Sequence, residues 1–306
     1  MISTSKHALT HAVAGSLGGM LSMILLYPLD QVRTLMQGNE DGQFKGLSIF
    51  GVTKIVVKNE GFDCLYRGII PVVSTVGASN FIYFFAFHFA KVLLLHYRQK
   101  EITLSVVENM LLSSFAGIIC VLSTAPFWVA TSRIKMGNYS SSDMKKGMIK
   151  SSAHIGIFDI LLEIWRKEGS KALWDGTVPS LILVTNPIIQ FVIYEVFKSK
   201  IIMYPNSNGF SGSDAFILGA FAKTFATVAT YPLQLAQNKL RIKSKEPDGK
   251  PSYCGTLDCL LKVQKKDGIL GMFQGMNAKL LQTVLNAAFM FMYYEKIAAF
   301  VSFIIQ

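Results

Sequence analysis

The sequence predicts an all-α membrane protein with three repeats of about 100 residues. A proline embedded in an apolar, glycine-bearing segment recurs at Pro28, Pro126 and Pro232. An acidic residue followed by glycine recurs behind each proline, at Glu60-Gly61, Glu168-Gly169 and Asp267-Gly268. A fixed internal period of this kind sets the architecture before any local pattern does.

The composition indicates a membrane protein. Of the 306 residues, 51% are hydrophobic and only 16% are charged, and the mean hydropathy is positive. Soluble domains carry about 25% charged residues. The net charge of +11 suits anionic lipid headgroups and a small anionic substrate. The basic residues are dispersed among apolar segments, which argues against nucleic-acid binding.

Six long helices are expected to span the membrane. The first members of the three pairs cover residues 8–37, 106–136 and 212–242, and the second members cover 70–97, 177–200 and 276–303. Polar residues interrupt several of these segments, and at membrane depth such groups must face protein or water. We therefore expect residues 1–306 to form one transmembrane domain around a wet cavity, with repeats at about 8–100, 104–202 and 210–303.

A short amphipathic segment separates the two long helices of each repeat. In the second repeat, Ile157, Ile160, Leu161 and Ile164 recur at helical spacing. A helix with one apolar face is typical of the membrane interface. Three interfacial helices are predicted, at Phe50–Lys58, Ile155–Arg166 and Leu257–Lys266.

No pattern for catalysis, metal binding or a cofactor was found. The four cysteines and five histidines show no metal-ligand spacing. There is no nucleophile elbow, phosphate-binding loop or dinucleotide fingerprint. We expect four unpaired thiols, no metal, no cofactor and no enzymatic activity.

The repeated prolines have a mechanical interpretation. A proline deep in a helix removes one backbone hydrogen bond and kinks the helix. Asp30 and Arg33 follow Pro28 by two and five residues and therefore share one helical face. Three such helices could close a pore with a ring of interhelical contacts. The alternative is that the prolines simply end three helices.

These motifs resemble the mitochondrial carrier family over essentially the whole chain. The family pattern is a proline, an acid two residues later and a base five residues later, followed by the glycine signature. The first copy matches in full, the second has Trp128 and Thr131, and the third has Gln234 and Gln237. The resemblance implies six tilted helices, alternating access to one central site, and a monomer.

The resemblance also implies two gates at opposite ends of the central site. The matrix-type gate would pair Asp30 with Thr131, Trp128 with Gln237 and Gln234 with Arg33. The cytosolic-type gate would pair His88 with Lys198, Glu195 with Ala298 and Glu295 with Lys91. Because only the last pair is a complete ion pair, we expect both gates to be weaker than the family pattern, especially the matrix-type gate.

Some substitutions are more specific. The segments 126–128, 131–133, 231–234 and 279–285 are similar to those of peroxisomal adenine nucleotide and coenzyme A carriers. This implies exchange of adenine nucleotides or adenine-containing cofactors (coenzyme A, FAD or NAD) across the peroxisomal membrane. A mitochondrial inner-membrane carrier for another anion, and a scaffold or channel, remain open.

Lys223, inside the helix predicted at 212–242, is the first candidate for binding the substrate. A lysine at this depth is costly and most often functional, although one near a helix end can snorkel. The resemblance places further contacts midway along the second helix of each repeat, near Thr75, Ile182, Leu183 and Thr283. Lys279 is a second cation, or an interfacial lysine. Side-chain amides could bind base, ribose or a neighbouring helix: Asn186, Gln190, Gln282 and Asn286.

Three further cations lie beyond the prolines; they could guide anions to the exit, but we expect them on a solvated face. They are Arg133, Lys239 and Arg241.

Overall fold

The computed structural model describes residues 21–38, 46–98, 104–137, 156–202, 212–242 and 253–286, together with Phe44 and Phe289. These residues form helices and turns, without a strand among them. They belong to two compact units, which are described separately. The first comprises Met1–Met36, Gly42–Ile69 and Gly275–Gln306, and the second Gln37–Asp41 and Ile70–Gln274.

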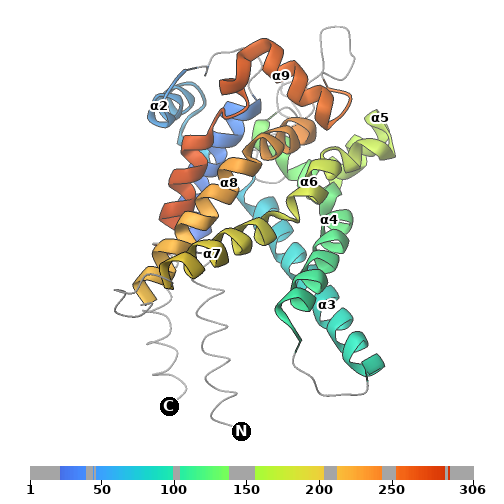
Figure 1. Ribbon diagram of the computed structural model, residues 1–306. Helices are drawn as coiled ribbons and strands as arrows, with labels where there is room; N and C mark the ends of the chain where they lie inside the picture. Colours follow the sequence, from blue (N-terminus) through green and yellow to red (C-terminus); the bar gives the residue numbers. More distant parts are fainter. Residues whose placement is uncertain are drawn as a thin grey trace, which may run out of the picture. The chain divides into compact units, whose positions relative to one another are not determined.

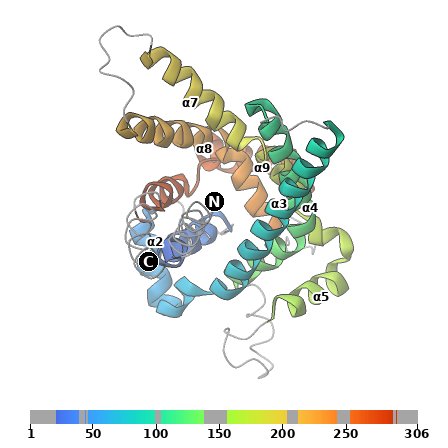
Figure 2. The same ribbon diagram turned by 90° about the horizontal axis from the view of Figure 1, so that it is seen from below.

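The second unit contains most of the helices (Figures 1 and 2). Helix α4 packs on α5, α6 and α8, and α6 and α7 both pack on α8. Helix α3 lies beside α4, where Cys120 Sγ donates a hydrogen bond to the Ser79 carbonyl at 3.3 Å. The helices are α3 (Ile69–Arg98), α4 (Val106–Met136), α5 (Ile157–Glu168), α6 (Thr177–Leu183), α7 (Asn186–Ile202), α8 (Gly212–Ile242) and α9 (Thr256–Gly271).

The first unit contains the helix at residues 21–38 up to Met36, α2 (Ile49–Glu60), the 3₁₀ helix η1 (Phe62–Tyr66) and the helix at 276–286. Tyr27 Oη donates a hydrogen bond to the Arg67 carbonyl at 2.7 Å, and its ring stacks on Tyr66 with centroids 6.2 Å apart. These contacts connect the long helix to the turn that follows η1.

Most predicted helix bounds are confirmed. Helices α4 and α8 have the predicted ends, and α3 extends the predicted segment by one residue on each side. The segment predicted at 177–200 is instead two helices, because Pro187 removes a backbone donor and a turn at 184–185 interrupts it. Parts of two other predicted helices, residues 8–20 and 287–303, lie outside the described residues apart from Phe289.

The prolines lie within helices and do not end them. Pro126 lies inside α4 and Pro232 inside α8, and residue 28 is helical as well. Helix α4 begins at a capping box in which Ser105 and Glu108 bond each other's backbone N–H, and it ends at Gly137. The alternative that the prolines mark helix ends is therefore wrong.

Both repeated glycines of each copy adopt a left-handed backbone. Gly61, Gly169 and Gly268 have φ of 83°, 85° and 69°. The glycines that close the signature, Gly68, Gly176 and Gly275, have φ of 75°, 77° and 80°. L side chains rarely adopt such angles, so the repeated glycines are explained by backbone conformation.

Replacing Gly176 with alanine should destabilise the protein more than replacing Gly169. A Cβ at Gly176 would lie 2.9 Å from the Gln237 carbonyl oxygen and 3.0 Å from Arg241 Cγ, whereas nothing lies within 4 Å at Gly169. Both variants carry the cost of positive φ, about 1–2 kcal/mol, and only Gly176→Ala adds a clash with α8. Thermal unfolding in detergent checks this order, and equal losses would contradict it.

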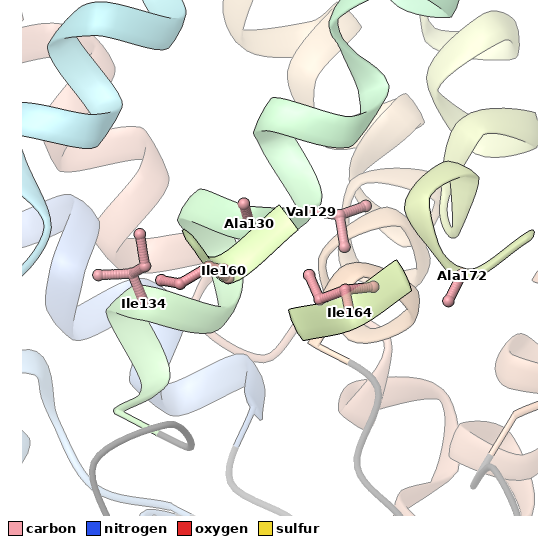
Figure 3. Packing of buried hydrophobic residues seen from close by; sticks show 6 residues of the cluster. All are labelled: Val129, Ala130, Ile134, Ile160, Ile164 and Ala172. Carbon is pink, nitrogen blue, oxygen red and sulfur yellow. The ribbon is translucent and has the colours of Figure 1, made fainter. Parts of the chain in front are cut away.

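The three short helices repeat one packing pattern. In α5, Ile160 and Ile164 are buried against Val129, Ala130 and Ile134 of α4 (Figure 3). The corresponding buried pairs are Val52 and Val56 in α2, and Cys259 and Val263 in α9. The opposite face of α5 exposes apolar side chains to the surroundings: Phe158, Leu162 and Trp165. A helix buried on one face and apolar on the other fits the predicted membrane interface.

Four segments are long and apolar enough to cross a membrane within the described residues. They are Phe62–Tyr97, Val106–Met136, Ser170–Lys200 and Phe216–Ile242. No disulfide joins any of the four cysteines, all of which lie in the described part of the chain.

Candidate functional site

A polar stripe runs along one face of α8. Lys223, Thr227, Thr230 and Gln234 follow each other at spacings of three or four residues and therefore share one face. Gln234 Nε2 donates to Thr230 Oγ1 at 3.2 Å. The opposite face exposes apolar side chains, Ile217, Phe221 and Phe225. Lys223 is exposed and lies on the polar side of this membrane-spanning segment.

Helix α7 meets this stripe at its first residue. Asn186 Nδ2 donates to Thr230 Oγ1 at 3.2 Å, so this amide nitrogen makes a contact between helices. Among the other predicted contacts in this unit, Thr75 is buried and its hydroxyl donates to the Pro71 carbonyl. Leu183 and Gln190 are half-buried, and Ile182 is exposed. The structure therefore places Asn186 against the polar stripe of α8, through its contact with Thr230.

The predicted site residues of the last repeat belong to the first unit. Thr283 Oγ1 donates to the Lys279 carbonyl at 2.8 Å, one turn earlier in the same helix. The side-chain oxygen of Gln282 is buried and has no hydrogen-bond partner in the described part of the chain. Asn286 is half-buried.

Near the end of α8, Arg241 makes a cation–π contact with the indole of Trp128 in α4. The Arg241 guanidinium lies 5.5 Å from the centre of the Trp128 ring. Gln237, the partner expected for Trp128, donates to Ser180 Oγ of α6 at 2.7 Å, and Arg241 donates to the same oxygen at 3.1 Å. Ser180 in turn donates to the Gly176 carbonyl. Helices α4, α6 and α8 are thus joined by one polar cluster, Trp128, Ser180, Gln237 and Arg241.

A buried ion pair connects α4 to the last residue of α5, just before η3 (Ser170–Trp174). The Arg133 side chain is 3% exposed. Its guanidinium donates to Glu168 Oε1 at 2.6 Å and Oε2 at 3.0 Å, and it lies 3.9 Å from Asp175. Arg133 Nε also donates to the Arg241 carbonyl at 3.2 Å. The expected solvated face is wrong for Arg133 and Lys239, which are both buried because they bind carboxylates or pack on aromatic rings.

A third cluster joins the end of the 21–38 helix to α8. Gln37 is fully buried. Its Nε2 donates to Tyr231 Oη at 2.8 Å, and its Oε1 accepts from Asn238 Nδ2 at 2.5 Å. A Cβ at the adjacent Gly38 would lie 2.5 Å from Met136 Sδ and 3.1 Å from Ile242 Cδ1. Residues 37 and 38 therefore lie close to the ends of α4 and α8 within the second unit.

Several residues of the two predicted gates have partners within their own helices. Arg33 Nη1 lies 3.7 Å from Asp30, which confirms that they share a face. Lys198 lies 3.7 Å from Glu195 and above the Tyr194 ring. The Thr131 hydroxyl donates to the Trp128 carbonyl. His88 is exposed and Lys91 is half-buried. Residues 295 and 298 lie outside the described residues.

The second repeat differs from the others in one connection. In the first and third repeats, the tyrosine before the proline donates to the carbonyl that precedes the last glycine, at 2.7 Å from Tyr27 and 2.8 Å from Tyr231. The second repeat has Ala125 at that position. There Trp174 Nε1 donates in the reverse direction, to the Leu122 carbonyl of α4 at 3.2 Å.

Comparison with known proteins gives a consistent result. Three segments, residues 4–98, 103–205 and 210–303, match the mitochondrial carrier protein family. The chain belongs to this family. Its all-α, three-repeat membrane fold is therefore confirmed.

Several curated proteins resemble this chain over almost its whole length. Peroxisomal membrane protein PMP34 of Mus musculus is 37% identical, over 96% of this chain and 94% of its own. The peroxisomal nicotinamide adenine dinucleotide carrier of Arabidopsis thaliana is 31% identical, over 95% of both chains. Peroxisomal adenine nucleotide carrier 1 of Glycine max is 28% identical, over 95% of this chain and 91% of its own.

Sequence reasoning missed several residues at the ends of these carrier helices. Gln37 and Lys135 each lie nine residues after a repeated proline; Arg241 has the same position in the third repeat and was named as a cation, but its contact with Trp128 was not expected. The compared motif ends at the base five residues after each proline. Comparing the three repeats four residues further would have identified this position. Ser180 and Asn238 give no signal in the sequence, because their partners come from distant segments.

Proposed function

We propose that this protein is a carrier that exchanges adenine nucleotides, or cofactors that contain adenine, across the peroxisomal membrane. Family membership supports a transporter built as one domain of three repeats. The names of all three relatives support the organelle, and two of them, the nicotinamide adenine dinucleotide carrier and the adenine nucleotide carrier, support the substrate class. No covalent step is needed, since the proposed reaction moves an intact anion from one side to the other.

Lys223 is the observation that supports an anionic substrate most strongly. An exposed ammonium group inside a membrane-spanning segment must reach water or an opposite charge. Because Lys223 shares a face with Thr227 and Thr230, and Ile217 and Phe221 are on the other side, its position fits a wet interior. We assign the phosphate of the substrate to Lys223, and Lys279 remains a separate candidate cation within the first unit.

We also propose that the polar clusters form the matrix-type gate. Trp128 and Arg241 contribute a cation–π contact where the family pattern has an ion pair. Gln37 and Asn238 contribute a hydrogen bond between two neutral amides. Such contacts are individually worth about 0.5–2 kcal/mol. A gate of this strength can open without breaking a strong ion pair, which suits alternating access.

Replacing Trp128 with leucine should loosen this gate, whereas phenylalanine should retain part of the contact. Ser132 is 8% exposed in the structure. The native cysteines are first removed, and Ser132→Cys then provides a single labelling position. The rate at which this cysteine reacts with a water-soluble maleimide should rise by about 2- to 30-fold when Trp128 is replaced by leucine. Equal labelling rates for the leucine and phenylalanine variants would contradict a role for the aromatic ring.

The proposed substrate is tested by uptake into liposomes that contain the purified protein. Labelled ATP, AMP, coenzyme A, FAD and NAD are compared with carboxylates and amino acids. We expect saturable uptake of at least one adenine compound. Uptake of carboxylates alone would contradict the proposal, and imaging of the tagged protein in cells separates the peroxisomal from the mitochondrial membrane.

A further inference from the structure

The carbonyl group of Leu122 in α4 lacks its usual helical donor. In an α-helix, each N–H donates to the carbonyl four residues earlier, and Pro126 has no N–H to donate to Leu122. Both residues lie inside the membrane-spanning segment Val106–Met136. A carbonyl without a donor is unfavourable at membrane depth, because lipid tails cannot supply a hydrogen bond. This carbonyl therefore requires a donor from outside the ladder of α4.

The indole of Trp174 supplies that donor. Its Nε1 donates to the Leu122 carbonyl oxygen at 3.2 Å, from a position 52 residues later in the chain. Trp174 is the last residue of η3, and both residues belong to the second unit. The bond that is missing within α4 is thus replaced by a bond from another element of the same repeat.

Two side chains of the second repeat differ from those of the other repeats at this point. In the third repeat, Phe273 stacks on Tyr231 with ring centroids 6.2 Å apart. In the first repeat, the same two positions hold a pair of stacked tyrosines. The second repeat has the small Ala125 in place of the inner tyrosine and Trp174 in place of the outer ring. Of the three outer rings, only that of Trp174 carries an N–H group.

The 3₁₀ helix η3 also contacts α4 beyond the proline. Ala172 of η3 is buried in the same cluster as Val129, three residues after Pro126 (Figure 3). Trp174 binds Leu122, four residues before the proline. One short element is therefore fixed to α4 on both sides of the residue at which a helix bends most easily.

We propose that Trp174 is a positioning residue, which replaces the N–H group absent from Pro126 and limits the bending of α4 at that proline. Trp128 lies two residues after Pro126, so the direction of α4 beyond the proline determines where its indole meets Arg241. The consequence for transport rests on the proposed gate, in which Trp128 and Arg241 form one contact.

A double-mutant cycle on the full chain in detergent tests the hydrogen bond. Trp174→Phe retains an aromatic ring without the N–H, and it should lower the Tm by about 2–4 °C. Pro126→Ala restores the helical donor to Leu122, so Trp174→Phe should lower the Tm of that variant by no more than about half as much. Trp165→Phe is the matched control, because Trp165 is also an exposed indole of this repeat. It should change the Tm little in either background.

Maleimide labelling of Ser132→Cys, in the protein without native cysteines, tests the positioning role. Trp174→Phe should raise the labelling rate by about 2- to 10-fold, as expected for the loss of one hydrogen bond. Trp165→Phe should leave the rate unchanged. Neither readout requires transport, so a failure of adenine nucleotide uptake is distinguishable from a failure of this proposal.

Equal losses of Tm from Trp174→Phe in both backgrounds would show that Trp174 acts through packing alone, and they overturn the proposal. Unchanged labelling in Trp174→Phe, beside faster labelling in Trp128→Leu, overturns the positioning role. If neither variant is labelled faster, the proposed gate is wrong, and the Tm cycle alone decides whether Trp174 replaces the missing bond.

A second measurement applies if Pro126→Ala does not fold. In NMR spectra of the wild-type protein with labelled tryptophan, the indole N–H of Trp174 should exchange with deuterium more slowly than that of Trp165. Equal exchange rates overturn the hydrogen bond to Leu122 and the proposal with it.

Discussion

Replacing Arg133 with alanine should destabilise the protein by about 3–5 kcal/mol, the usual loss when one partner of a buried ion pair is removed. The change leaves the Glu168 carboxylate, 16% exposed, without the guanidinium that donates to both of its oxygens. It also removes the donor to the Arg241 carbonyl. Thermal or denaturant unfolding of the purified protein in detergent measures the effect.

The control for this prediction is an arginine on the exposed surface of α5. Arg166→Ala removes the same charge from an exposed position, where substitutions usually change stability by less than about 0.5 kcal/mol. Arg133→Lys should fall between the two, because an ammonium group cannot make the bidentate contact. A loss for Arg133→Ala no larger than that for Arg166→Ala would show that the buried pair contributes little.

Replacing Lys223 with alanine should raise KM for nucleotide exchange by about ten- to hundredfold, the loss expected for one hydrogen bond to a charged group. The maximal rate should change less, provided that the lysine binds the phosphate equally throughout the transport cycle. Lys223→Arg retains the charge and should recover much of the affinity. Initial rates in liposomes at several nucleotide concentrations separate the two parameters.

Lys200→Ala gives the matched control for Lys223. It lowers the net charge by the same amount, but Lys200 is an exposed residue in the last turn of α7. A similar rise in KM for both variants would indicate general attraction of anions, and it would contradict a specific contact at Lys223.

The repeat pattern predicted most of the fold because it depends on local chemistry. The ends of α4 and α8 follow from hydrophobic length, and the repeated glycines follow from backbone angles that only glycine adopts easily. The break between Leu183 and Asn186 was missed. Pro187 was visible in the sequence, but the continuous apolar run of the segment outweighed it.

The candidate site was less predictable, because its partners come from distant segments. Lys223 could be selected from its depth alone. In contrast, the pairing implied by the family's matrix-type gate expected Gln237 beside Trp128. In the structure, Gln237 donates a hydrogen bond to Ser180, and Arg241 lies over the Trp128 indole. Arg133 and Lys239 look like surface cations in the sequence, and only tertiary packing shows that they are buried.

The most direct test of an adenine nucleotide exchanger is uptake with and without internal nucleotide. Liposomes that contain the purified protein are loaded with ATP, AMP or buffer alone, and labelled ATP is added outside. The account predicts saturable uptake that depends on the internal nucleotide, since one central site would return with a substrate bound. Uptake that increases linearly with concentration and does not depend on the internal nucleotide would indicate a channel and contradict the account.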